Sequence, residues 1–325
     1  MSARVSVLIP CHNAAEHVGA TLACALDQTW GDLEIILVED GSTDNSANVL
    51  GAINDPRLKM LYGEKKGAAA ARNRAFAASS GEFVLYLDAD DLIEREHVAR
   101  LHAAIATVPM NVALGEWDRF QQHPSQAEFP PRATYVDASG PEWLSIDWMA
   151  ARPMTQCGMA LIPRGLVEMH GGWDERLTLV DDFEFFARII SRSAGVRHAA
   201  GARLYYRSNL PGSLSGRKSR KAVESAFLSL MLGTQHLIEA ENNPKTRRAC
   251  ANVLQDFDYT HYPNHADLRT KARARAAELG GAILNPDGPP GFHRLRRLVG
   301  WRAARRLQRF VEARGGRPAI RRVSL

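Results

Sequence analysis

Short runs of consecutive apolar residues mark the first hundred positions of the chain. They lie at residues 5–10, 33–38 and 83–87 and are rich in Val, Ile and Leu. Runs without polar alternation are typical of strands buried on both faces, as in a mainly parallel sheet. Between them, apolar residues recur at helical spacing, for example Val98, Leu101 and Ile105. Because strands alternate with helices, the sequence predicts an α/β fold with a Rossmann-like central sheet flanked by helices.

The pattern changes twice further along the chain. Residues 117–153 carry five prolines and predict loops around one or two short elements. Sheet-like runs follow at 155–162 and 202–207, with a helix at about 181–192 between them, and helical periodicity dominates from residue 217. We therefore predict three parts. Residues 1–115 and 116–216 form two halves of one α/β domain, and residues 217–325 form a helical extension.

Composition narrows the class of protein. The chain has 325 residues, of which 45% are hydrophobic and 24% charged, enough for a large core without cross-links. Four cysteines are too few and too widely spaced for a disulfide framework or a zinc ribbon. No signal-peptide pattern opens the chain and no run of about 18 apolar residues occurs, so we expect a cytoplasmic protein that does not span a membrane.

The net charge of +5 conceals two regions of opposite sign. Residues 1–216 contain 19 Lys and Arg against 27 Asp and Glu, whereas residues 217–325 contain 22 against 9. The front of the chain is thus acidic and the last third strongly basic. Any attraction to an anionic partner should reside in that last third.

Acidic residues follow two of the predicted strands. Asp40 lies two residues after the run at 33–38, and Asp88, Asp90 and Asp91 follow the run at 83–87. In open α/β sheets, ligands bind beyond the carboxyl ends of the strands, so both groups should line one crevice. Clustered carboxylates favour a hard cation such as Mg²⁺ or Mn²⁺. The alternative is that these acids cap a helix that begins at Leu92 and Ile93.

The ordered set of segments resembles the family 2 glycosyltransferases of the GT-A fold. The segment VSVLIPCHNAAEHVGATLACALDQTWGDLEIILVEDGSTDNS resembles the opening strand, helix and acidic second strand of that family. The segment GAAAARNRAFAASSGEFVLYLDADD resembles its Ala-rich helix and Asp-X-Asp strand. The resemblance spans about residues 4–215. Signatures of P-loop and dinucleotide-binding proteins are missing from the sequence.

The resemblance implies roles for individual residues on the donor side. Asp40 would contact the base of a nucleoside-diphosphate sugar, with the main chain from Pro10 to His12 in the same pocket. Asp88 would hold the ribose or sugar, and Asp90 would ligate the metal. Arg72 would face the charge of the donor. For Arg72 the alternative is a solvated charge on a helix, and for His12 it is an ordinary loop residue.

A second segment resembles the acceptor side of the family. Gly171-Gly172-Trp173-Asp174-Glu175 is followed by the acidic pair Asp181-Asp182, which opens a predicted helix. In that pattern the second acid is the catalytic base, here Asp182, with Asp181 supporting or competing. A sugar hydroxyl attacks poorly until a carboxylate takes its proton, which agrees with the role. Helix capping is the alternative, and it can coexist with catalysis. Glu184 and Arg188 are four residues apart and predict an ion pair.

One position departs from the family. Many relatives carry a His after the last strand that helps to bind metal or diphosphate, and here Ser208 or Asn209 stands in that place. We assign Asn209 as a metal ligand through its amide oxygen, and the metal preference stays open.

The end of the chain is highly basic. Residues 292–325 contain 11 Arg and one Glu, with Phe292, Leu295, Val299, Leu307 and Phe310 at roughly helical spacing. This pattern is typical of an amphipathic helix on an anionic membrane surface, although Arg296 and Arg306 flank the apolar stripe and Trp301 lies opposite it. A solvated helix is the alternative. Nucleic acid is disfavoured because no nucleic-acid-binding module is recognisable.

Together these features predict an inverting, metal-dependent hexosyltransferase-type enzyme. It would move a sugar from a nucleoside-diphosphate sugar to a hydroxyl of a glycan or lipid-linked acceptor in polysaccharide or cell-envelope glycan synthesis. We expect it in the cytoplasm, in peripheral contact with the inner face of the membrane. The alternatives are a non-catalytic scaffold that retains the fold, and a nucleotidyltransferase, for which a Gly-rich, Lys-bearing opening loop is missing.

Overall fold

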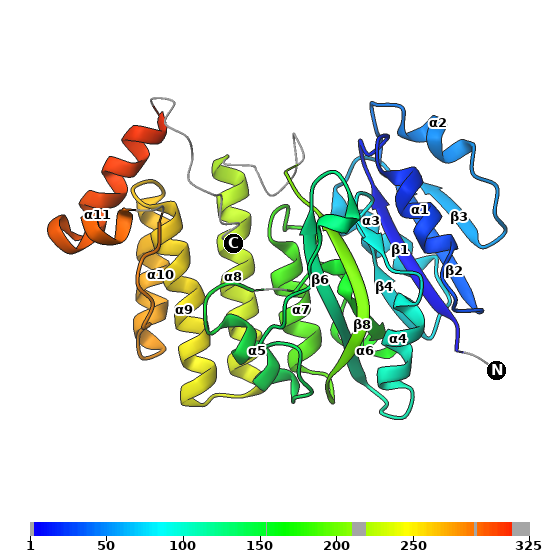
Figure 1. Ribbon diagram of the computed structural model, residues 1–325. Coiled ribbons are helices and arrows are strands. Elements are labelled where there is room, and N and C mark those ends of the chain that lie inside the picture. Colours follow the sequence, from blue (N-terminus) through cyan, green and yellow to red (C-terminus); the bar gives the residue numbers. More distant parts are fainter. Residues whose placement is uncertain (1–2, 154, 210–218, 289–290, 314–325) are drawn as a thin grey trace.

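The computed structural model describes residues 3–153, 155–209, 219–288 and 291–313 (Figure 1). Within these residues the chain forms a mixed sheet and eleven α-helices. The strands are β1 (Val5–Cys11), β2 (Leu33–Glu39), β3 (Leu58–Tyr62), β4 (Phe83–Tyr86), β5 (Leu92–Ile93), β6 (Asn111–Phe120), β7 (Ala160–Pro163) and β8 (Gly195–Arg207). The helices of the α/β part are α1 (Val18–Leu26), α2 (Ser46–Gly51), α3 (Ala68–Ala77), α4 (His97–Ile105), α5 (Gly140–Trp148), α6 (Arg164–His170) and α7 (Asp181–Ser191).

The strand order of the sheet is β3-β2-β1-β4-β7-β6-β8-β5. The first four strands in this order run parallel, and the apolar runs of β1, β2 and β4 are buried because helices cover the sheet, whereas β3 is a partly exposed edge strand. β7 pairs antiparallel with both β4 and β6, and β6 and β8 pair parallel to each other. The predicted strands of the first half and the α/β class are confirmed. The carboxyl ends of β1, β2 and β4 therefore meet at one edge.

One local prediction needs correction. The expected helix at Leu92 and Ile93 is wrong, because these residues form β5, which pairs antiparallel with β8, and α4 starts only at His97. Asp88, Asp90 and Asp91 therefore lie between β4 and β5 and do not cap a helix. In the irregular stretch, Trp117 to Phe120 extend β6, and α5 is the short helix; its N-cap is Ser139, whose hydroxyl accepts a hydrogen bond from the amide of Glu142.

The helical extension packs directly on the second half of the α/β part. Its members are α8 (Arg220–Ala240), α9 (Pro244–His261), α10 (Ala266–Glu278) and α11 (Phe292–Ala313). α8 lies against α7, and α9 lies against α5, α8 and α10, so these helices stand side by side next to the sheet (Figure 1). Leu230 and Leu237 of α8 are fully buried in the same hydrophobic cluster as Phe183 of α7. The extension thus completes the core of the α/β part.

α11 bends at Gly300, whose φ of 77° lies in the left-handed region that glycine adopts without strain. The bend breaks the helical stripe expected from the sequence. Phe292 is buried, whereas Val299, Leu307 and Phe310 are each about half exposed. Trp301, expected opposite the apolar stripe, packs edge-on against Tyr259 and Tyr262. No helix in the described chain combines the length and the hydropathy of a membrane span.

Candidate active site

The candidate site lies at the edge of the sheet where β1, β2 and β4 end. β1 pairs in parallel with both β2 and β4, so the residues that follow these three strands converge. Asp40 follows β2, His12 follows β1, and Asp88 lies two residues beyond β4. The structure thus brings the two acidic groups singled out in the sequence to one edge, as topology requires.

Arg72 of α3 joins the two halves of this site. Its guanidinium donates a 2.8 Å hydrogen bond to Asp88 Oδ1 and another of 2.8 Å to Asp181 Oδ2. The side chain is only 7% exposed, so the solvated alternative for Arg72 is wrong. Burial alone would favour the neutral form, but the two carboxylates hold the pKa of Arg72 well above its ordinary value. Arg72 therefore ties a residue of the predicted donor side to one of the predicted acceptor side.

Asp181 and Asp182 have different surroundings although they are adjacent. Asp181 is paired with Arg72, whereas Asp182 accepts a 2.9 Å hydrogen bond from the amide of Phe183. Burial, followed by the nearby charge of Asp181, raises the pKa of Asp182 to about 7. Val180 is the N-cap residue and makes no side-chain capping bond, but Asp181 and Asp182 lie in the first turn of α7, where the bond from Phe183 lets Asp182 also support the start of the helix. Asp182 is thus a carboxylate poised to exchange a proton near neutral pH.

The three acids after β4 also differ. Asp91 is 1% exposed and accepts a 2.8 Å hydrogen bond from the amide of Arg207 at the end of β8. This hydrogen bond fixes the loop to β8, and burial raises the pKa of Asp91 well above its ordinary value. Burial and the neighbouring charge of Asp88 raise the pKa of Asp90 to about 6. Asp90 is thus a partly buried carboxylate whose ionised form a cation would stabilise.

Few of the described side chains at this edge are placed to ligate a cation. Among the described residues no group of three or more His, Cys, Asp or Glu side chains is arranged to hold a metal ion. Mg²⁺ commonly takes only one or two protein carboxylates and completes its coordination with substrate phosphates and water. Asp90 fits that arrangement as a single carboxylate ligand, since Asp88 is paired with Arg72 at 2.8 Å. Asn209 is exposed, has a left-handed φ of 64°, and its role as a ligand stays a prediction.

The pocket predicted to bind the nucleotide base of the donor is built from main-chain contacts around Asp40. Both oxygens of its carboxylate accept hydrogen bonds, from the amides of Lys66 at 3.2 Å and Gly67 at 2.8 Å. The imidazole Nδ1 of His12 lies 3.0 Å from the carbonyl oxygen of Asp40. Pro10 lies in β1 beside Val38 of β2. The structure therefore places Pro10, His12 and Asp40 in one cluster, and their contacts with a donor stay predictions.

Trp173 is a site residue for which no individual role was predicted. Its ring lies 4.3 Å from the guanidinium of Arg72 and stacks at 4.1 Å on Phe185 of α7. Its main chain is held by Asn73, whose amide group exchanges hydrogen bonds of 2.7 and 2.9 Å with it. Trp173, the aromatic residue of the Gly-Gly-Trp turn, therefore covers the guanidinium of Arg72. Its place in that motif was the only available signal.

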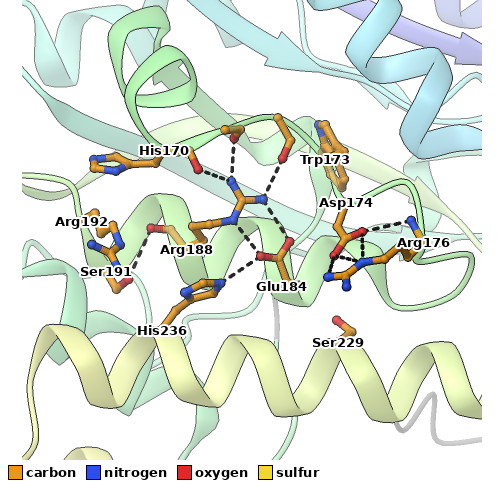
Figure 2. Close-up of polar contacts among 12 residues, drawn as sticks. His170, Trp173, Asp174, Arg176, Glu184, Arg188, Ser191, Arg192, Ser229 and His236 are labelled. Carbon is orange, nitrogen blue, oxygen red and sulfur yellow. Dashed lines mark hydrogen bonds and ion pairs between the residues drawn. The ribbon is translucent and has the colours of Figure 1, made fainter.

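The Gly-Gly-Trp turn is clamped by Arg188 (Figure 2). The Arg188 guanidinium donates hydrogen bonds of 2.6–2.8 Å to three successive carbonyl oxygens, those of His170, Gly171 and Gly172. It also forms the predicted pair with Glu184, at 2.7 Å, and His236 of α8 contacts the same carboxylate at 3.0 Å. This clamp connects α8 and α7 to the turn that carries Trp173, and so to Arg72.

The bridge formed by Arg72 gives a prediction about stability. Arg72→Met should destabilise the protein by about 1–3 kcal/mol, because it leaves Asp88 and Asp181 facing each other without a cation. The estimate lies below the value for a fully buried pair since these carboxylates are 32% and 18% exposed. Urea unfolding at pH 7 measures the loss. Adding Asp181→Asn should restore part of it, and equal stability of Arg72→Met and wild type would contradict the bridge.

Comparison with known proteins adds to this geometry. Residues 6–165 match the model of glycosyl transferase family 2. The glycosyltransferase GlyG of Streptococcus pneumoniae serotype 4 is 32% identical over 125 residues, which cover 38% of this chain and 42% of GlyG. The chain thus spans less than half the length of this curated relative. The succinoglycan biosynthesis protein ExoU of Rhizobium meliloti is 26% identical over 320 residues, covering 94% of this chain and 89% of ExoU.

A solved structure has the same fold. TarS of S. aureus, residues 1–349 in complex with UDP-GlcNAc, superposes with a TM-score of 0.62 at 18% identity, covering 85% of this chain and 89% of that one. The coverage extends beyond the region that matches the family model. The likeness confirms the predicted GT-A fold class.

Proposed function

We propose that the protein transfers a sugar from a nucleoside-diphosphate sugar to a hydroxyl group of a glycan or lipid-linked acceptor, because residues 6–165 match the model of glycosyl transferase family 2. The proposed transfer inverts the anomeric centre. The similarity to the succinoglycan biosynthesis protein ExoU along most of the chain supports a role in polysaccharide or cell-envelope glycan synthesis. The observation that carries the proposal is Asp182, a carboxylate with a pKa of about 7 beside the Arg72 bridge.

In the proposed reaction Asp182 is the general base. Its carboxylate accepts the proton of the acceptor hydroxyl while the hydroxyl oxygen bonds to the anomeric carbon, and the bond from that carbon to the diphosphate oxygen breaks. A base with a pKa near the working pH is ionised often enough to act and still basic enough to take the proton. Asp181 is held by Arg72, so it orients the site and does not compete for the proton.

On the donor side, Asp40 and the main chain from Pro10 to His12 bind the base, Asp88 binds the ribose or the sugar, and Arg72 balances charge. Asp90 and Asn209 would hold Mg²⁺ or Mn²⁺. When bound, such a cation would offset the negative charge of the departing diphosphate. The raised pKa values of Asp90 and Asp182 support this division, since burial and a neighbouring carboxylate outweigh the nearby charge of Arg207 at Asp90 and of Arg72 at Asp182.

The competing function is a non-catalytic scaffold for glycan assembly that keeps the fold. Thermal shift with UDP-, GDP- and dTDP-sugars and CMP-sugars, each with Mn²⁺, separates the two, because a ligand that binds the native state raises its stability. UDP-GlcNAc is the first donor to test, since it occupies TarS. Binding followed by release of nucleoside diphosphate supports an enzyme, and binding without release supports the scaffold.

We also propose that α11 contacts an anionic membrane surface, which gives a cytoplasmic protein a peripheral position at the inner face of the membrane. Of the large apolar side chains exposed in the described chain, five belong to α11: Leu298, Val299, Leu307, Phe310 and Val311. Arginines are interspersed among them. Exposed apolar groups beside cations are complementary to lipid tails and anionic headgroups.

Substitution of this apolar face should release the protein from membranes. Leu298→Ser with Phe310→Ser should lower co-sedimentation with vesicles of phosphatidylglycerol and phosphatidylcholine, and salt should lower wild-type binding because each Arg contributes about 1 kcal/mol near an anionic surface. Both positions are at least half exposed, so the fold should persist. Met169→Ser, at a position 63% exposed on α6, is the matched control. Equal sedimentation of all three proteins would contradict the proposal.

A further inference from the structure

We infer that Arg119, near the end of β6, binds a phosphate group of a substrate at the catalytic face. The inference rests on the proposed function and deepens it, because it names the charged group that the site recognises. The phosphate belongs either to the nucleoside diphosphate of the donor or to a diphosphate that links the acceptor to its lipid. No role was assigned to Arg119 from the sequence.

Two aromatic rings hold the Arg119 side chain. Its guanidinium carbon lies 5.5 Å from the centre of the Trp117 ring and 5.2 Å from that of the Tyr206 ring. The two rings contact each other edge-on at 5.7 Å, and Arg119 pairs with Tyr206 across the ladder of β6 and β8. Ring faces attract a guanidinium without using its N–H donors. The platform therefore fixes the side chain and leaves its hydrogen-bonding capacity available.

The charge of Arg119 is not balanced by a carboxylate. In the part of the chain that the structure describes, no hydrogen bond or ion pair engages its guanidinium. Neighbouring arginines differ, since Arg132 pairs with Asp118 at 3.3 Å and Arg203 with Glu116 at 3.5 Å. Arg119 is also only partly exposed. A held, partly buried guanidinium with unused donors is suited to a phosphate, which accepts several hydrogen bonds at once.

Arg119 lies close to the carboxylates of the candidate active site. Tyr206, which packs against Arg119, lies between Tyr205, which pairs with Leu92 directly after Asp91, and Arg207, whose amide donates a 2.8 Å hydrogen bond to Asp91. In agreement, burial and then the charges of Asp91 and Asp88 raise the pKa of Tyr206, whereas the charge of Arg119 lowers it. Five carboxylates gather at this edge: Asp88, Asp90, Asp91, Asp181 and Asp182. Arg72 is already paired with two of them. A diphosphate entering this edge would meet repulsion unless further cations receive it, and Arg119 is a cation in place to do so.

The test compares Arg119→Gln and Arg119→Lys with wild type by titration calorimetry. The probes are UDP, GDP and dTDP, each beside its uncharged nucleoside. For the diphosphate that wild type binds, Arg119→Gln should weaken binding about 10- to 100-fold, with binding of the nucleoside unchanged. Arg119→Lys should recover part of the loss, because it keeps the charge. Arg302→Gln is the matched control, since Arg302 also lies over a ring, that of Trp301 in α11.

A second arm distinguishes the source of the phosphate. If diphosphate binding is unchanged in Arg119→Gln, the KM for a short-chain polyprenyl-diphosphate sugar should rise about tenfold or more, while the KM for the same sugar as an octyl glycoside stays constant. Either result supports phosphate recognition by Arg119. No change in both arms overturns it and leaves the proposed function standing. Failure of wild type to bind any of the diphosphates would overturn the proposed function as well.

Discussion

Replacing Asp182 with Asn is expected to lower sugar transfer by about 10²–10⁴-fold with little change in donor affinity. Asn has nearly the same shape and can accept the hydrogen bond from the amide of Phe183, but it cannot take a proton. Transfer rates and donor titrations on the two proteins measure the effect. Asp181→Asn is the matched control and should lose less, because its carboxylate pairs with Arg72. Near-full transfer by Asp182→Asn would contradict the assignment of the base.

The pH dependence follows from the pKa of about 7 at Asp182. Transfer by wild type should rise with pH as this carboxylate ionises, and the remaining activity of Asp182→Asn should lack that limb. The free energy of unfolding, unlike the transfer rate, should fall as the pH rises. Because burial raises the folded-state pKa above the ordinary 3.8, the contribution of Asp182 to stability is full below about pH 4 and is lost as pH rises to about 7. Asp182→Asn should not show this loss in pH-dependent unfolding.

Replacing Asp90 with Asn is expected to abolish the divalent-cation dependence of donor binding. The change removes the charged oxygen of the one carboxylate predicted to ligate Mg²⁺ or Mn²⁺, and the position lies in a loop beyond β4, so the fold should persist. Thermal shift with UDP-GlcNAc, with Mn²⁺ and with EDTA, measures the effect for wild type and variant.

The control for this experiment is Asp27→Asn, at a carboxylate that is 66% exposed and paired with Arg95 at the surface. It should behave as wild type. Equal stabilisation of Asp90→Asn and wild type by the sugar nucleotide, with EDTA changing neither, would show that the cation site is elsewhere or that binding needs no cation.

Much of the first half of the fold was predictable because its signals are local. Strands buried on both faces require apolar runs, and β1, β2 and β4 carry them. β5 was missed since its two residues are strands only through their pairing with β8, more than a hundred positions later. The bend of α11 was missed because the helical spacing was followed through Gly300, beyond which Trp301 turns toward Tyr259 and Tyr262.

The candidate site shows the same division between local and distant information. Acids at strand ends were visible in the sequence, and the sheet brings them together. The Arg72 bridge was not visible, since Asp181 lies 109 positions from Arg72 and the contact depends on how α3 and α7 meet. Arg188 was expected to pair with Glu184, but its hydrogen bonds to three carbonyl oxygens depend on the path of the preceding turn.

The most direct test of glycosyl transfer is the release of nucleoside diphosphate from a panel of sugar nucleotides, measured for wild type and Asp182→Asn with Mn²⁺ and an acceptor mixture of short-chain lipid-linked sugars. We expect wild type to turn over at least one sugar nucleotide and to form a glycosidic product of inverted configuration. The Asp182→Asn variant should lack this activity. A wild-type protein that is stabilised by none of the sugar nucleotides and releases no nucleoside diphosphate would contradict it.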